Sequence, residues 1–202
     1  MKKESFLHWT ESELKAIAKP KVPKRTYREF GEIFVSEIIS VTGGIFAGTM
    51  LALAVDKLAL IPGILILMPG FLEMRGNISG SLAARLSAAL HLKLINGDKH
   101  SRRMQHSNVW AAFMLGILVS AFLGFVAYLG TLLFFKISYP KIIIVALVAG
   151  IISNMIMIPI TTKTTIWLFR HGHDPDNIMG PYITTLGDIV SVASLLLGIW
   201  LV

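Results

Sequence analysis

A single carboxylate, Asp188, lies within the apolar stretch that ends the sequence. A charged carboxylate at the centre of a membrane-spanning helix costs about 2.5–3.5 kcal/mol on insertion scales, so it needs water, a cation or a charged partner. Thr184, Thr185 and Ser191 lie three or four residues from Asp188, which places them on one side of a helix. This spacing predicts a cation site centred on Asp188. The alternative is a buried ion pair, for which Arg85 is the obvious partner.

A second group of polar residues lies within residues 68–77, where a proline and a glycine interrupt the apolar pattern. Unwound backbone at membrane depth is tolerated only inside protein or beside water, where freed carbonyls and helix ends can bind ions. Glu73 and Asn77 follow this break, and a simple kink does not explain them. We therefore expect both residues at the cation site. The alternative is that the proline and glycine only bend the helix to fit its neighbours.

These residues belong to a chain of 202 residues that is 54% hydrophobic and 15% charged, with a mean hydropathy of +0.67. An ordinary soluble domain has about 25% charged residues, so this chain has too few to cover a globule. The composition excludes a normal soluble enzyme and indicates a protein embedded in a lipid bilayer. The net charge of +7 is better explained by membrane topology and anionic lipid than by nucleic acid. Cysteine is absent, which excludes disulfides and thiolate metal sites.

Five apolar segments are long enough to span a membrane, which takes about 20 residues. They cover residues 33–55, 58–92, 108–135, 142–168 and 181–202. The predicted fold is an all-α integral membrane protein with five transmembrane helices per protomer, of which the second is broken or kinked. Within the fourth segment, we expect Ser153 and Asn154 to form hydrogen bonds across helices.

The polar residues 1–32 precede these segments, so the sequence predicts an N-terminal segment at 1–32 and a membrane domain at 33–202. Thr10 and Glu13 have the spacing of a capping box, which predicts a short amphipathic helix that ends near Ala18. Fourteen lysines and arginines fall on the N-terminal side of the predicted topology and three on the other. The positive-inside rule then places the N-terminus in the cytoplasm and Val202 outside.

The histidines add little to this prediction. His171, His173 and Asp174 have a spacing seen in soluble metal clusters, but the sequence places them in a loop that we expect to be solvated. His91 is expected in the loop before the third segment. No nucleophile and base are spaced for catalysis, so we expect neither an enzyme nor a bound organic cofactor.

Two stretches resemble a known family, the MgtE-related magnesium transporters. Residues 69–89, PGFLEMRGNISGSLAARLSAA, resemble the second-helix motif and are closer to the eukaryotic solute-carrier relatives, whose repeats have Gly-Asn followed by Ala-x-Arg-Leu-Ser. Residues 174–188, DPDNIMGPYITTLGD, resemble the entry into the family's last helix. The two motifs occur in the family's order, and the resemblance covers residues 33–202.

The resemblance implies a five-helix protomer that pairs with a second copy around a cation pore. Asp188 matches the carboxylate that holds partly or fully hydrated Mg²⁺ at the pore centre, and Thr184 would add a carbonyl or hydroxyl oxygen. Gly76 and Asn77 match the second-helix motif near the pore. The solute-carrier relatives hold two repeats in one chain and this sequence holds one, which suggests a homodimer. Glu73 departs from the usual bacterial motif and suggests an extra site or a coupling residue.

The leading hypothesis is therefore a homodimeric transporter or channel for divalent cations, most of all Mg²⁺, with Asp188 as its central carboxylate. Ca²⁺, Mn²⁺ or Co²⁺ could also bind, because carboxylate and water suit several hard divalent cations. One alternative is an exchanger that couples Mg²⁺ to Na⁺ or H⁺ through Glu73. A further alternative is a structural or accessory membrane subunit that transports nothing.

Overall fold

The computed structural model describes residues 24–95 and 98–202. This part of the chain is all helical and contains no strand, as the sequence predicts. It forms five helices: α2 (Lys24–Ala59), α3 (Ile64–His91), α4 (Lys99–Phe135), α5 (Lys141–Arg170) and α6 (Pro175–Leu201).

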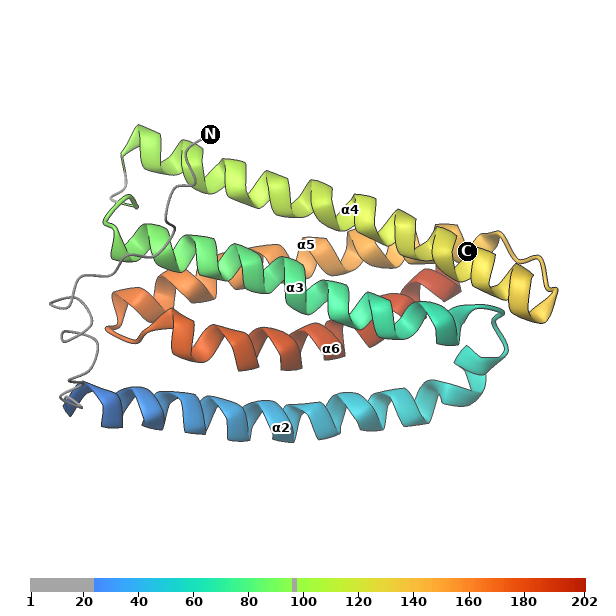
Figure 1. Cartoon of the computed structure of the whole chain (residues 1–202), viewed down its shortest axis with the longest axis horizontal. Helices are drawn as coiled ribbons and strands as arrows, with labels where there is room; N and C mark the ends of the chain where they lie inside the picture. Colours follow the sequence, from blue (N-terminus) through green and yellow to red (C-terminus); the bar gives the residue numbers. More distant parts are fainter. Residues whose placement is uncertain (1–23, 96–97) are drawn as a thin grey trace, which may run out of the picture.

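The five helices lie side by side along the long axis of the molecule and alternate in direction, because short connections join them (Figure 1). Helix α3 has a central position and packs against α4, α5 and α6. Helix α2 lies at the edge of the bundle, and its main contact is with α6. The start of α2 and the end of α6 point toward opposite ends of the bundle (Figure 1).

Four of these helices are long and apolar enough to cross a membrane, namely α2 over Tyr27–Asp56 and the whole of α4, α5 and α6. Large apolar side chains cover their outer surfaces: Ile45 of α2 is 68% exposed and Trp200 of α6 is 81% exposed. Such a surface suits lipid and not water, so the chain is a multi-pass membrane protein. Helix α3 is long enough but more polar, and the fifth span stays a prediction.

Helix α3 continues from Ile64 to His91 with Pro69 inside it. The unwound segment expected within residues 68–77 is therefore not found, and the kink stays a prediction. The chain turns instead at residues 60–63, where Gly63 has a φ of 85°. Glycine adopts this left-handed conformation at no steric cost, and a Cβ atom there would also lie 2.5 Å from Thr131 Oγ1.

Helix α2 begins at Lys24, so residues 24–32 of the predicted N-terminal segment belong to the same helix as the first predicted membrane span. The predicted short helix from Thr10 to Ala18 lies outside the described residues. The division of the chain at residue 33 stays a prediction.

A buried arginine lies where α3, α5 and α6 meet. Arg75 is 1% exposed, and its Nη1 donates a hydrogen bond of 2.5 Å to Oδ1 of Asn154, which is fully buried. Asn154 Nδ2 in turn donates to the carbonyl oxygen of Phe113 on α4, at 3.5 Å. The guanidinium also stacks over the ring of Phe71 at 5.5 Å. The prediction of hydrogen bonds across helices is confirmed for Asn154, which joins α5 to both α3 and α4. It is wrong for Ser153, whose buried hydroxyl has no hydrogen-bond partner among the described residues.

Helices α4 and α5 approach closely at a glycine. A Cβ atom on Gly124 of α4 would lie 2.9 Å from the Cα of Ile143 on α5. Backbone atoms cannot move aside as a flexible side chain can, so the two helices would have to separate. At Gly48 on α2, by contrast, no neighbouring atom lies within 4 Å of the place that a Cβ atom would occupy.

We expect Gly124→Ala to lower the free energy of unfolding by about 1–3 kcal/mol, because the added methyl group overpacks the contact between α4 and α5. The measurement is unfolding of the purified protein in mixed detergent micelles, followed by tryptophan fluorescence. Gly48→Ala is the matched control and should change the free energy of unfolding by no more than about 0.5 kcal/mol. Equal effects of the two substitutions would contradict this account of the packing.

We expect Asn154→Leu to lower the free energy of unfolding by about 1.5–3 kcal/mol, because it leaves the buried guanidinium of Arg75 without its acceptor. Adding Arg75→Met should restore part of this loss, since replacing both partners with apolar groups can be nearly neutral. A double-mutant cycle in the same unfolding assay measures the coupling. Losses that simply add would show that the hydrogen bond contributes nothing to stability.

Candidate cation site

The polar residues predicted around Asp188 on α6 do not all face the same way. In a helix, the residue three positions before a given residue and the residue three positions after it point about 60° to opposite sides of it around the helix axis. Thr185 accordingly turns toward α2, where its hydroxyl donates a hydrogen bond of 2.8 Å to Ser40 Oγ. Ser191 turns into the bundle and is fully buried. Thr184 remains exposed one turn before Asp188, so only Thr184 and Asp188 are left to form a polar pair at the surface of α6.

The polar residues of α3 divide between two opposite sides of the helix. Glu73 and Asn77 are both exposed, and Asn77 Nδ2 donates a hydrogen bond of 3.3 Å to Glu73 Oε1. Arg75, only two residues from each, points about 200° away and lies in the interior. Gly76, which is half-buried, has open space where a Cβ atom would be. The exposed side of α3 therefore carries a carboxylate and an amide, and the positive charge lies behind them.

Helices α3 and α6 bring these two polar surfaces together. Gly187 of α6 is buried, and a Cβ atom there would lie 3.6 Å from the Cβ of Arg75 on α3. Its neighbour Asp188 then lies close enough to Glu73 for the two negative charges to interact. The structure thus places Glu73, Asn77, Thr184 and Asp188 along the junction of α3 and α6, and it directs Thr185 toward α2.

Asp188 is half-buried, and in the described part of the chain it has neither a hydrogen bond nor an ion pair. Arg85, the partner that an ion pair would use, is exposed on α3 and donates through Nε to the carbonyl oxygen of Ser81, at 3.1 Å. Two carboxylates that face each other repel unless a cation or a proton lies between them. The arrangement can therefore hold a cation through carboxylate, amide and hydroxyl oxygens, the ligands that hard divalent cations prefer.

Sequence reasoning did not separate these roles within α3. The spacing of Glu73, Arg75 and Asn77 indicated polar groups in a membrane segment, and the 3.6-residue period already assigns Arg75 to the opposite side. The sequence could not indicate that Asn154, 79 residues away, supplies the acceptor for Arg75.

Comparison with known proteins identifies the family of this chain. The model of the MgtE family, described as a divalent cation transporter, matches residues 68–198, which include all four residues at the junction. Solute carrier family 41 member 2 is 26% identical to this chain in Xenopus laevis, over 81% of this chain and 30% of the relative. The human protein of that name is 26% identical over 87% of this chain and 32% of its own length.

Solute carrier family 41 member 3 from Rattus norvegicus is 28% identical over 66% of this chain and 30% of the relative. The chain thus spans about a third of the length of the curated relatives that it matches. No solved structure matches the chain. Because the family model covers most of the sequence, including both helices of the site, the chain belongs to the MgtE family of divalent cation transporters, which are not enzymes.

Proposed function

We propose that this chain transports divalent cations, chiefly Mg²⁺, across a membrane through a pore formed by two copies, with Asp188 as the central binding carboxylate. The main support is that Asp188 has no protein partner among the described residues and lies close enough to a second carboxylate, Glu73, for the two charges to interact. Membership of a family of divalent cation transporters agrees with this chemistry.

Magnesium suits a site of this kind because Mg²⁺ gives up its water reluctantly and is usually held by only one or two carboxylates. Asp188 and Glu73 would contact the hydrated ion, with the oxygen atoms of Thr184 and Asn77 as further acceptors for its water molecules. Ca²⁺, Mn²⁺ and Co²⁺ share part of this preference and are the competing cargoes.

Pairing of two protomers is supported by the exposure of the site. Glu73, Asn77 and Thr184 are all exposed in a single chain, although polar side chains in a membrane should face protein or water. A second copy placed against this surface would enclose them and bring two Asp188 carboxylates near one axis. In this arrangement, α3 is the fifth span, and its polar side lines the pore and avoids lipid.

The membrane domain in this proposal is residues 33–202, and the distribution of lysine and arginine supports a cytoplasmic N-terminus with Val202 outside. Thr185 contributes through its contact with Ser40, which holds α2 against α6. Gly76 contributes by keeping the α3 surface open beside Asn77.

We expect Asp188→Asn to reduce Mg²⁺ uptake into proteoliposomes by about tenfold or more, because the lost carboxylate should supply at least about 1.4 kcal/mol of binding. The measurement is uptake followed with an enclosed Mg²⁺ indicator. Asp56→Asn is the matched control, since Asp56 is exposed near the end of α2 and should not affect uptake. Unchanged uptake in Asp188→Asn would exclude the assigned site and favour a structural subunit.

We expect Glu73→Gln to raise the Mg²⁺ concentration for half-maximal uptake by about threefold or more, because a charge in a partly wet site contributes on the order of 1 kcal/mol. Uptake should not respond to an imposed Na⁺ or pH gradient, either in this variant or in the unmodified protein. Glu37→Gln, at another exposed glutamate, is the control. Gradient-driven uptake that disappears in Glu73→Gln would instead identify a coupled exchanger.

A further inference from the structure

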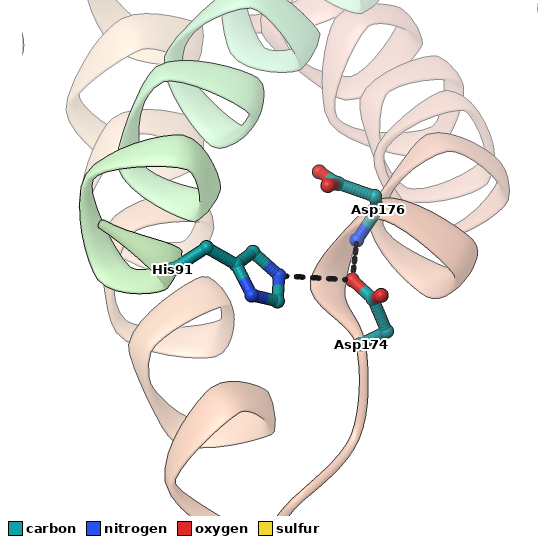
Figure 2. A group of neighbouring side chains, drawn as sticks. All are labelled: His91, Asp174 and Asp176. Atoms are coloured by element: carbon teal, nitrogen blue, oxygen red, sulfur yellow. Dashed lines mark hydrogen bonds and ion pairs between the residues drawn. The ribbon is translucent and has the colours of Figure 1, made fainter. Parts of the chain in front are cut away.

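A second group of metal-ligating side chains lies at the end of the bundle where α2 and α6 begin. His91 is the last residue of α3, Asp174 caps the N-terminus of α6, and Asp176 lies in the first turn of α6. One ligand atom of each lies within 4.8 Å of the others (Figure 2). Asp174, in the loop that the sequence predicted to be solvated, thus contacts His91, which lies 83 residues earlier in the chain. The prediction that His91 lies in a loop is wrong, because it is the last residue of α3.

The imidazole of His91 is held in place by a neighbouring ring. His91 and Phe169 of α5 pack edge to face, with ring centroids 5.0 Å apart. His91 Nε2 then lies 3.4 Å from Asp174 Oδ1. Figure 2 shows the imidazole pointing from the end of α3 toward the turn that leads into α6. One ligand is therefore oriented before any metal binds, which lowers the entropy that binding must overcome.

The distance between these two atoms suits a tetrahedral metal ion. Two ligands about 2.1 Å from a zinc ion and separated by the tetrahedral angle are about 3.4 Å apart. Octahedral ligands of Mg²⁺ at about 2.0–2.1 Å are closer, at about 2.9 Å when adjacent. Asp176 is exposed, so its side chain can rotate to complete a set of three protein ligands.

A cavity of about 370 Å³ adjoins this group and contains a second histidine and carboxylate. Glu32 of α2 lies 3.1 Å from His173 Nδ1 and accepts a hydrogen bond of 3.2 Å from Asn177 Nδ2. Arg28, one turn before Glu32, donates to the carbonyl oxygen of Gly172. The surroundings therefore combine imidazole and carboxylate groups from three parts of the chain, with room for water beside the metal ligands.

We propose that His91, Asp174 and Asp176 bind a divalent transition metal ion of the zinc type, separate from the Mg²⁺ of the pore. Imidazole suits zinc and its neighbours among the transition metals, whereas Mg²⁺ prefers sites made only of oxygen ligands. The metal ion joins the end of α3 to the start of α6, the two helices that carry Glu73 and Asp188. Binding at this site does not depend on the proposed transport function.

The test uses the purified 202-residue chain in detergent at pH 7.5, with any affinity tag removed and metal stripped by a chelator. Zn²⁺ is titrated in competition with a chromophoric chelator. We expect one ion per chain and an affinity that falls by about 10- to 100-fold or more in His91→Ala and in Asp174→Asn. Asparagine caps helices as well as aspartate does, so Asp174→Asn removes a ligand charge without removing the helix cap.

Two controls separate this site from the rest of the protein. His100→Ala removes another exposed histidine, and Asp56→Asn removes an exposed aspartate outside both proposed sites. Both variants should bind Zn²⁺ as the unmodified chain does. A large excess of Mg²⁺ should not displace the ion. Unchanged binding in His91→Ala, loss of binding in Asp56→Asn, or displacement by Mg²⁺ would each overturn the proposal. Failure of Mg²⁺ transport would leave the zinc result unaffected.

Discussion

The high free energy of a charge in contact with lipid determines how α3 lies in this bundle. Glu73 and Arg75 are two residues apart, so a helix must direct them to opposite sides. Arg75 turns inward and finds Asn154 and the ring of Phe71. Glu73 turns outward beside Asn77 and lies close enough to Asp188 for their charges to interact. The central position of α3, with α4, α5 and α6 around it, keeps Arg75 away from hydrocarbon, whereas Glu73 stays exposed on the single chain.

Close helix packing makes this arrangement possible. Gly187 lets α6 approach the Cβ of Arg75, and the same approach places Asp188 near Glu73. On the other side of α6, Thr185 bonds to Ser40 and secures α2, which has few other contacts with the bundle. The residues on either side of Asp188 thus hold neighbouring helices, and Asp188 itself is left without a protein partner among the described residues. In the proposed function, structural and ion-binding roles would be divided between adjacent positions of one helix.

At the end of the bundle, helices α3 and α6 meet again, but there they present a different set of metal-ligating groups. The junction of α3 and α6 offers oxygen atoms, whereas the ends of these helices add the imidazole of His91 to the carboxylates of Asp174 and Asp176. Ligand type decides which metal a site prefers, so one pair of helices can hold a hard cation at its middle and a transition metal at its end. Both sites depend on the register between α3 and α6, which Gly187 and Arg75 help to set.

The sequence alone determined the all-α membrane fold and the approximate positions of the helices, because hydropathy is a local property. It also singled out Asp188 as the candidate carboxylate, because the cost of a charge within an apolar segment can be read locally. The 3.6-residue period of a helix also implies that Arg75 and Glu73 face opposite ways, although the prediction from the sequence did not use it. Only the tertiary structure decided that Thr185 bonds to α2, that Arg75 meets Asn154, and that His91 lies beside Asp174. Each of these contacts joins residues that are far apart in the chain. Whether they form depends on how whole helices pack, and a local sequence pattern does not predict that packing. The uninterrupted helix at Pro69 has a related cause: neighbouring helices can support a proline that the local pattern takes for a break.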